Sequence, residues 1–491
     1  MPTAAPIPQQ DKSQTEPGQR EPNHRIDHLI DQIKAARDYI AQHLFVDPDL
    51  EVINGKPVNH WKILLGLICA VGRKNMLLTG VKSTGKTTYA SLLSSVVSGL
   101  PFDLYDIHKI QGHPEQAKDT MFVRVDLSNL AQEGVVWQPA MYLDFATFDE
   151  LNRNLPGKVA IATEYIRTGI MEHLGKYLRR PKPGMFATLN FNGVGTYPIP
   201  PPVFDRFDIS LEFMPGPSFL QPHILEASRT IKRTLIDEDL TDEITANLLD
   251  KSRSPQDKFT FLENTSARYR DAKPLIPFMP SIQSPDLQSV DVDLPFSPHA
   301  KTLVDCILDE LNTTKLYGTN RGADLPDDSS HNQAFASAKA NEGVAARFYE
   351  SLVYFSSMLA RITKDPGSSG DLEITVDHVM ALAPYLLAHR LEFTPLFEGQ
   401  YKKQQRLKGE REEMDLTRRL VNSIKANYDT IKEAVHILDY FLSLYPDRKE
   451  ELKPAEWRMV RKILKGPPPD HPLLLTYYHE SKRQLADPII P

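Results

Sequence analysis

The sequence has little cysteine and no long apolar run. Only Cys69 and Cys306 occur among the 491 residues, far apart in the chain, which excludes a disulfide framework and predicts no cysteine metal site. This scarcity fits a reducing cytoplasm. The longest apolar run, Ile63 to Val71, is far shorter than the ~20 residues that a membrane-spanning helix requires. Residues 1–22 lack the apolar core of a signal peptide. We therefore expect a soluble, cytoplasmic chain with no membrane span.

Positive charge is not in excess either. The formal net charge is -7, so the chain as a whole has no electrostatic attraction to nucleic acid or to an anionic membrane. No zinc-binding, helix-turn-helix or oligonucleotide-barrel module is recognisable, and nucleic acid is not an expected partner. What is present is 41% hydrophobic residues, enough for sizeable cores. Length and composition together predict a globular protein of two or three domains.

Apolar periodicity predicts a sheet enclosed by helices in the first half of the chain. Helical spacing runs from His24 to Leu44 and from Asn59 to Val71, and a third helix begins at Lys86 and ends at Gly99. Short apolar runs predict four buried strands, at residues 73–79, 145–148, 184–189 and 208–212. Because strands and helices alternate, the expected fold class is α/β, with a parallel sheet flanked by helices on both faces.

The second half is predicted to be helical, with irregular stretches. Residues 214–340 are less regular: Pro274 to Pro298 carries six prolines and Thr319 to Ala340 is polar, as is typical of loops or insertions. Helices are expected at residues 345–362, 375–391, 401–444 and 454–465. In the last of these, Trp457, Val460 and Leu464 form an apolar stripe that we expect to dock onto the preceding helical domain. The alternative is a basic surface for a membrane or nucleic acid.

One segment has the pattern of a phosphate-binding loop. It matches GxxxxGK[ST] at every fixed position and stands between an apolar strand and a helix, the context in which the pattern is informative. Its glycines allow backbone N–H groups to face a phosphate, Lys86 supplies charge to the β- and γ-phosphates, and the Thr87 hydroxyl can coordinate Mg²⁺. An incidental Gly/Ser/Thr-rich turn is the alternative. The residues predicted to bind ATP are Gly80, Val81, Lys82, Ser83, Thr84, Gly85, Lys86, Thr87 and Thr88.

An acidic pair follows a second apolar strand. A phosphate-loop ATPase needs one carboxylate for Mg²⁺ and usually another to orient the attacking water. Asp149 and Glu150 supply these two groups, Asp149 for the metal and Glu150 for the water. Asp144 is a rival that lacks an adjacent second carboxylate. The pair could instead be the solvated start of a helix, where acids favour the dipole.

Six segments in order resemble the MoxR-type family of AAA+ ATPases. The segments are Asp149–Arg153 (DELNR), Glu164–Gly169 (EYIRTG), Phe186–Asn190 (FATLN), Gly195–Pro200 (GTYPIP) with Asp205–Phe207 (DRF), Gly343–Arg347 (GVAAR), and Ile374–Val379 (ITVDHV) with His389–Leu391 (HRL). Composition predicts a disordered tail over residues 1–22. The resemblance implies an AAA+ core with N-terminal helices over 23–213 and an all-α lid domain with an insertion over 214–391. The helices that follow predict a helical C-terminal extension over 392–491.

The resemblance also implies roles for three polar residues. Asn190 would be sensor 1, aligning the attacking water, with Asn192 as a competing candidate. Arg206 would be the arginine finger that reaches the ATP site of the neighbouring subunit, and Arg347 would be sensor 2. Cations at such places stabilise the charge that spreads over the transferred phosphoryl group. In the alternative interpretation, Asn190 caps a turn, Arg206 is a structural ion-pair partner, and Arg347 is a solvated helix residue.

Three departures from the family pattern stand out. Thr147 interrupts the apolar run before the acidic pair, and Ala345-Ala346 stand where Ser-Pro is usual. The long spacing between Arg206 and Arg347 suggests an insertion somewhere in Lys251–Asp327. Insertions are where surfaces diverge, so the insertion bears on any partner inferred from the family.

The family resemblance further implies a ring, expected to be a hexamer, that remodels or activates a client protein, often one with a von Willebrand factor A domain. The alternatives are a helicase-like motor acting on nucleic acid, or an assembly factor that hydrolyses ATP slowly. A hairpin insert of this clade is expected within Thr168–Lys182. Residues 167–182 hold five Lys or Arg and one Glu, a net +4. This segment is either a loop that engages the client or a solvated turn.

Overall fold

The structure is a computed structural model. It describes residues 20–113, 122–125, 135–173, 175–190, 196–197, 199–278, 293–311, 346–364, 372–391, 393, 413–445 and 448–486. Several predicted features lie outside these residues: most of the tail over 1–22, the polar stretch Thr319–Ala340, and Asn192, Gly195 and Pro198. The segment Gly343–Ala345, which precedes Arg347, also lies outside them.

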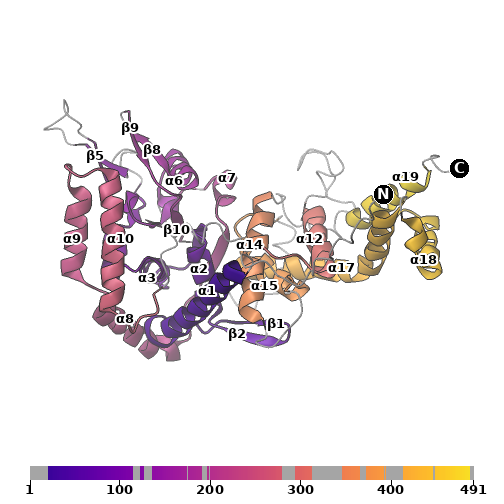
Figure 1. The fold of residues 1–491 in the computed structure, drawn as a ribbon, viewed down its shortest axis with the longest axis horizontal. Coiled ribbons are helices and arrows are strands. Elements are labelled where there is room, and N and C mark those ends of the chain that lie inside the picture. Colours follow the sequence, from indigo (N-terminus) through magenta and orange to yellow (C-terminus); the bar gives the residue numbers. More distant parts are fainter. Residues whose placement is uncertain are drawn as a thin grey trace, which may run out of the picture.

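A five-stranded parallel sheet forms the centre of the larger half of the molecule (Figure 1). Its strands are β3 (Met76–Gly80), β4 (Ile110–Gln111), β7 (Phe145–Asp149), β10 (Gly184–Thr188) and β11 (Ile209–Phe213), in the spatial order β11-β3-β10-β7-β4. Every residue of β3, β10 and β11 is buried, as expected for parallel strands covered on both faces. The four predicted strands are confirmed to within three residues at their ends.

Helices and small two-stranded sheets accompany this sheet in the same half of the molecule. They are α1 (Arg20–Tyr39) with the π-helix η2 (Ile40–Leu44), α2 (Trp61–Val71), α3 (Lys86–Ser98), α4 (Phe102–Ile107), α6 (Pro156–Thr168) and α7 (Pro201–Phe204), with the pairs β1 (Leu50–Ile53) and β2 (Lys56–Asn59), β5 (Val123–Val125) and β6 (Val135–Trp137), and β8 (Ile170–His173) and β9 (Lys176–Arg179). Short 3₁₀ turns lie at η4 (Pro139–Met141), η5 (Leu151–Arg153), η6 (Ser218–Leu220) and η8 (Lys449–Glu451). α3 ends before Gly99, as predicted, and Gly99 has a φ of 68°, the left-handed conformation in which glycine often ends a helix.

The prediction of an irregular segment over residues 214–340 is wrong for residues 298–311, which form a helix, and for residues 221–272. Three helices lie there, α8 (Gln221–Thr234), α9 (Glu238–Leu249) and α10 (Pro255–Ala272), and Figure 1 places α9 and α10 at the sheet end of the molecule. The Ser266 hydroxyl of α10 donates to Ser98 O at 2.6 Å, at the end of α3. These helices therefore pack on the core. The predicted domain limits at 213/214 and 391/392 stay predictions.

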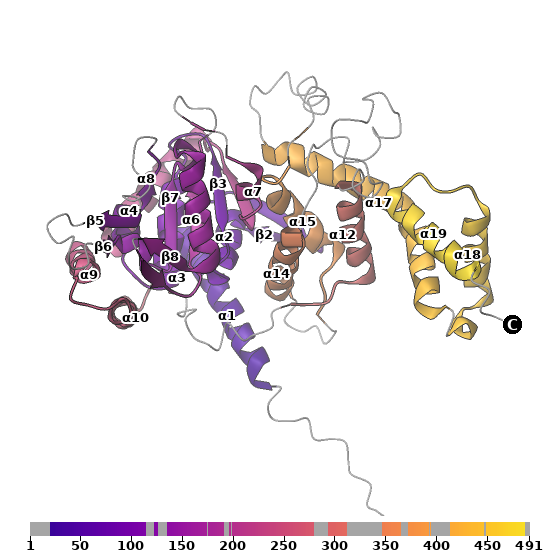
Figure 2. The same cartoon turned by 90° about the horizontal axis from the view of Figure 1, so that it is seen from above.

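Further helices extend away from the sheet along the long axis of the molecule (Figure 2). They are α12 (Pro298–Leu311), α14 (Ala346–Thr363), α15 (Val376–Leu387), the long α17 (Glu413–Leu444), α18 (Pro454–Lys465) and α19 (Pro472–Ala486). The residues after α15 hold this part to the core, since Arg390 Nη2 donates to Phe207 O at 2.6 Å. No helix in the described parts of the chain combines the length and apolarity needed to cross a membrane.

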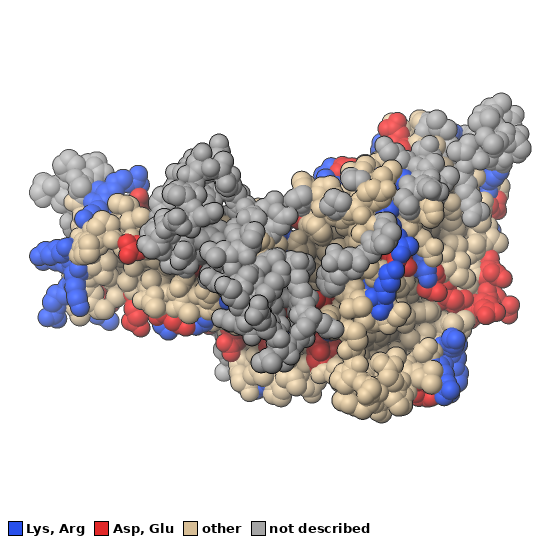
Figure 3. Space-filling view, turned by 180° about the vertical axis from the view of Figure 1, so that it is seen from behind, with Lys and Arg blue, Asp and Glu red and all other residues tan. Residues whose placement is uncertain are grey.

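The apolar stripe of α18 is buried, but not where it was predicted to dock. Val460 and Leu464 pack with Leu438 and Phe441 of α17 and with Tyr478 of α19, in a cluster separate from the main core. The predicted docking on the preceding domain is therefore wrong, because α17 and α19 supply a closer apolar surface. Arginine and lysine side chains gather at this end of the molecule (Figure 3).

Stability should fall as the solution becomes acidic, in part because of His378 in α15. This side chain is 2% exposed and lies between the hydroxyls of Thr375 and Thr363, and burial lowers its pKa to about 4. Between pH 7 and pH 5 the unfolded chain gains a proton on this residue that the folded chain does not, so folding loses about 2 kcal/mol.

Chemical denaturation at the two pH values measures this loss. The His378→Asn variant keeps an acceptor for the N–H of Thr375 and removes the titration, so its pH dependence should be flatter by about the same 2 kcal/mol. An equal pH dependence in both proteins would contradict the assignment to His378.

Candidate nucleotide-binding site

The predicted phosphate loop connects the end of β3 to the start of α3. Gly80 has a φ of 127°, and a Cβ there would meet Phe213 O at 2.0 Å, so only glycine fits beside β11. Gly85 has a φ of 85° and immediately precedes the first helical residue, Lys86. These two positions bend the chain into a loop at the N-terminus of α3, where unpaired backbone N–H groups favour an anion.

The Lys86 side chain lies over this loop. Its Nζ donates to Gly80 O at 3.1 Å and to Val81 O at 2.5 Å, and the residue is 6% exposed. Burial lowers the pKa of Lys86, while the nearby Asp149 and Glu150 act in the opposite direction. The ammonium group is thus held at the loop by weak carbonyl acceptors that an anion can replace.

Asp149, the last residue of β7, lies beside the loop. Its Oδ1 accepts hydrogen bonds from Thr87 Oγ1 at 2.7 Å and from Thr188 Oγ1 at 2.8 Å. A hydroxyl of α3 and a carboxylate of β7 are therefore adjacent, although 62 residues separate them in the chain. Oxygen donors of this kind are the ligands that Mg²⁺ prefers.

Glu150 adopts a left-handed backbone conformation, with a φ of 52°. Non-glycine residues in this region are uncommon and strained, and such residues cluster at functional sites. Its carboxylate is held from two sides: Asn190 Nδ2 donates to Oε1 at 2.5 Å, and Arg153 Nε lies 2.7 Å from Oε2. Its backbone N–H donates to Thr188 Oγ1 at 2.8 Å. The side chain is thus fixed in direction next to Asp149.

Asp144, the rival acid, lies in a different environment. Its Oδ1 accepts hydrogen bonds from Arg180 Nη2 at 3.1 Å and from Arg73 Nη2 at 3.3 Å. Arg180 also donates to the carbonyl oxygens of Met141 and Leu143. Asp144 therefore anchors a structural ion-pair cluster at the opposite end of β7 from Asp149.

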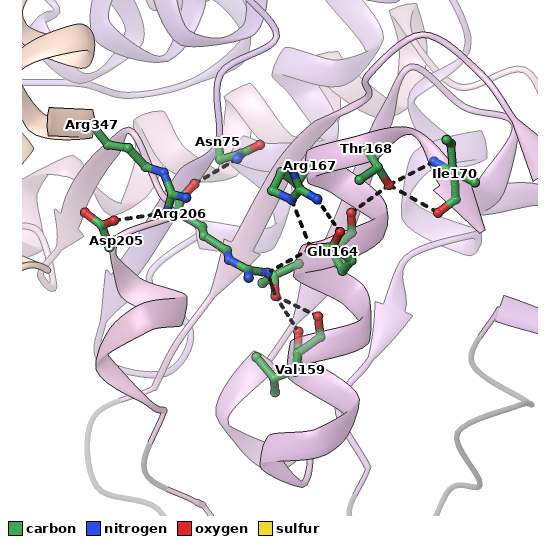
Figure 4. A network of polar contacts seen from close by, with 11 residues as sticks. Asn75, Val159, Glu164, Arg167, Thr168, Ile170, Asp205, Arg206 and Arg347 are labelled. Carbon is green, nitrogen blue, oxygen red and sulfur yellow. Dashed lines mark hydrogen bonds and ion pairs between the residues drawn. The ribbon is translucent and has the colours of Figure 1, made fainter. Parts of the chain in front are cut away.

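The two predicted arginines have partners other than the acidic pair, and Figure 4 shows both arginines. Arg206 Nη1 donates to Thr163 Oγ1 of α6 at 2.8 Å and lies 3.8 Å from Glu164 Oε2. Arg347, at the start of α14, pairs with Asp205 at 3.0 Å. Asp205 also contacts Arg390 Nε at 3.5 Å. The structure thus brings Lys86, Thr87, Asp149, Glu150 and Asn190 together, and it directs Arg206 and Arg347 to other partners.

The predicted hairpin insert is confirmed. β8 and β9 form an antiparallel pair, from Ile170 opposite Arg179 to His173 opposite Lys176. Tyr177 and Ile170 are large side chains with exposed fractions of 52% and 44%. One of the basic residues counted in this segment, Arg180, is buried in the Asp144 cluster and does not belong to the solvent-facing charge.

Sequence reasoning missed the roles of three residues in this geometry. Thr188 bridges both members of the acidic pair, Arg153 pairs with Glu150, and Asp205 pairs with Arg347. Arg153 and Thr188 lie within segments that resemble the MoxR-type pattern, and Asp205 precedes the predicted finger, so each could have been singled out. Arg153 and Glu150 are three residues apart, whereas the partners of Thr188 and Asp205 come from distant parts of the chain and have no local signal.

One of the comparisons with known proteins bears on the fold. No family model matches the chain, and no curated protein matches its sequence. Among solved structures, the chain is similar to a protein from Cytophaga hutchinsonii that is provisionally assigned as an ATPase, with 15% sequence identity and a TM-score of 0.51. The match covers 83% of this chain and 98% of the other. At this identity the likeness concerns the fold. The chain has the fold class predicted from its sequence, a parallel sheet flanked by helices and followed by further helices.

Proposed function

We propose that this chain is a MoxR-type AAA+ ATPase that hydrolyses Mg-ATP and couples the reaction to remodelling or activation of a partner protein. The observation that carries the proposal is the meeting of the phosphate loop with the acidic pair, through the 2.7 Å hydrogen bond from Thr87 to Asp149. The fixed Glu150 carboxylate beside it adds the second group that ATP hydrolysis requires.

The residues at this place fit ATP and Mg²⁺. The phosphates would lie against the N-terminus of α3, with Lys86 exchanging its carbonyl acceptors for phosphate oxygens. Thr87 and Asp149 would hold the metal, Thr87 through its hydroxyl and Asp149 through water. When bound, Mg²⁺ neutralises charge on the phosphate oxygens.

Hydrolysis further requires an oriented water molecule. Glu150 would hold this water through its carboxylate. Asn190, whose Nδ2 binds Oε1 of Glu150, would act as a positioning residue for that carboxylate and as the sensor of the phosphate. Thr188, at the end of β10, would hold the acidic pair in place through its hydrogen bonds to both residues.

Arg206 and Arg347 would complete the site from outside the loop. Arg206 lies on the surface next to α6, where a neighbouring subunit of a ring could receive it, and its side chain is 29% exposed. To act as sensor 2, Arg347 must give up its ion pair with Asp205 and contact the nucleotide instead. The ring, expected to be a hexamer, and the client, with a von Willebrand factor A domain as the first candidate, rest on the MoxR-type resemblance. The exposed β8–β9 hairpin is the surface proposed to engage the client.

Replacing Glu150 with Gln tests the hydrolytic part of the proposal. The amide keeps the size of the side chain and loses the negative charge that orients the water, so turnover should fall by roughly 10²-fold or more while ATP still binds. ATP-bound oligomers should accumulate. Steady-state phosphate release and ATP affinity measure the two effects.

Glu263→Gln, the same change on an exposed acid of α10, is the matched control and should hydrolyse ATP at the wild-type rate. Near-normal turnover in Glu150→Gln would remove Glu150 from the mechanism. Asp144 is then the next acid to test, although its ion pairs favour a structural role.

A further inference from the structure

Three side chains with metal-binding atoms meet far from the nucleotide site. Cys306 and Glu310 stand four residues apart on one face of α12, and His471 lies just before α19. Cys306 and Glu310 are 0% exposed and His471 is 8% exposed. Their ligand atoms all lie within 4.8 Å of one another. We refer to these three residues as the α12–α19 cluster.

The distances within the cluster are those of a tetrahedral ion site. Cys306 Sγ lies 3.5 Å from Glu310 Oε1 and 3.6 Å from His471 Nε2, and His471 Nε2 lies 3.1 Å from Glu310 Oε1. For Zn²⁺ bonded to sulfur at ~2.3 Å and to nitrogen and oxygen at ~2.0–2.1 Å, tetrahedral angles give edges of about 3.5, 3.6 and 3.3 Å. The observed triangle agrees with these edges to about 0.2 Å.

We propose that the α12–α19 cluster binds one Zn²⁺ ion through Cys306 Sγ, Glu310 Oε1 and His471 Nε2. A thiolate, an imidazole and a carboxylate are the three kinds of ligand that zinc takes in proteins, and a water molecule completes the tetrahedron. The expectation of no cysteine metal site came from counting cysteines alone. The proposal departs from that expectation, because here one cysteine is joined by other ligand types.

The surroundings favour a cation. Asp305 and Asp309, on the same helix, interact electrostatically with Cys306, so several acidic groups gather at a buried place where a divalent ion offsets their charge. Asn427 of α17 donates from Nδ2 to both oxygens of Glu310, at 3.1 Å each. Such an outer hydrogen bond orients a ligating carboxylate.

Without an ion the same atoms form a hydrogen-bonded cluster. The Cys306 thiol and a protonated Nε2 of His471 both donate to Glu310, and Leu473 N–H donates to Nδ1 at 3.2 Å. Zinc binding displaces the thiol proton, moves the imidazole proton to Nδ1 and gives up the Leu473 contact. The two states therefore differ in metal content and in the tautomer of His471, which makes them distinguishable by experiment.

The position of the site indicates a structural ion. It would join α12 to the start of α19, and through Asn427 also to α17. A metal that cross-links two segments 161 residues apart in sequence stabilises the folded chain, because the unfolded chain offers no preformed site. The C-terminal helices would then depend on the metal for their attachment to α12.

The test uses the full-length protein purified without chelator and measures its zinc content by mass spectrometry. We expect about one zinc per chain in the wild type and in Cys69→Ser, the matched control in the other buried cysteine, and at least ~10-fold less in Cys306→Ser, Glu310→Gln and His471→Asn. A zinc chelator should lower the melting temperature of the wild type and leave that of the variants unchanged.

Cobalt titration of the wild type keeps the test valid if a variant fails to fold. Co²⁺ bound at this site should give a thiolate-to-metal charge-transfer band and the visible spectrum of a tetrahedral ion. Wild-type protein with no zinc, no such band and no effect of chelator would mean a hydrogen-bonded cluster only. Zinc retained at full stoichiometry in the folded variants would place the ion elsewhere. Either result overturns the proposal, and neither bears on ATP hydrolysis.

Discussion

Replacing Lys86 with Ala should weaken ATP binding by about 10²-fold or more while the fold stays intact. In the folded chain the Lys86 ammonium lies within hydrogen-bond distance of two carbonyl oxygens of the phosphate loop. It also offsets the charges of Asp149 and Glu150, which contribute to its pKa. Without it, an incoming triphosphate meets two carboxylates and loses its main cationic partner, so attraction becomes repulsion.

Calorimetric titration with ATP measures this effect, and thermal unfolding of the same sample checks the fold. Lys232→Ala removes an exposed lysine near the end of α8 and serves as the control, for which affinity should be unchanged. A folded Lys86→Ala protein that binds ATP as tightly as the wild type would refute the assignment of the phosphate loop.

Loss of Arg206 should reduce ATP hydrolysis by roughly 10³-fold or more, and the loss should fall on the neighbouring subunit. Arg206 contacts Thr163 and Glu164 on α6 of its own chain (Figure 4). Its backbone is fixed by Asn75, whose Nδ2 donates to Arg206 O at 2.8 Å. A fixed backbone with a partly exposed guanidinium is the arrangement expected of a residue that acts on another molecule.

Mixing two inactive proteins tests this directly. Arg206→Ala has an intact loop and no finger, whereas Lys86→Ala has an intact finger and no functional loop. In mixed rings some interfaces pair an intact loop with an intact finger, so part of the ATPase activity should return. A chain carrying both changes should rescue neither partner.

Native mass spectrometry must show that the rings have mixed. An active Arg206→Ala protein would refute the finger. Confirmed mixing without recovery would show either that Arg206 acts within its own chain or that all sites of the ring must fire together.

The parts of the site that could be predicted from sequence are those with a local pattern. The phosphate loop is contiguous, and its glycines, Lys86 and Thr87 have fixed spacing. The acidic pair and Asn190 each follow an apolar strand, and parallel strands bring their carboxyl ends to one edge of a sheet. The hydrogen bonds among Thr87, Asp149, Glu150 and Asn190 therefore join residues that sequence had already placed at that edge.

The parts that could not be predicted lack such a pattern. α8 buries only Ile231 and leaves Ile224 and Leu225 exposed, so it lies at the surface, and residues 221–234 were predicted to be irregular. The apolar stripe of α18 was identified, but its partners on α17 and α19 depend on how three helices assemble. In the α12–α19 cluster, Cys306 and Glu310 have helical spacing, whereas His471 is 161 residues beyond Glu310. No motif connects ligands at that separation.

The long helix α17 connects the core to the distal helices α18 and α19. Near its start, Met414 N donates to Glu212 of β11 at 3.1 Å, and Arg418 donates to Tyr385 of α15 at 2.6 Å. Its far end carries α18 and α19 through the cluster around Phe441. With 32 residues it is about 48 Å long, so a rotation of about 10° at the sheet would displace the distal helices by roughly 8 Å. A small change in the angle between the core and the helices beside it would thus produce a displacement at the C-terminal end several times larger than the displacement near the nucleotide site.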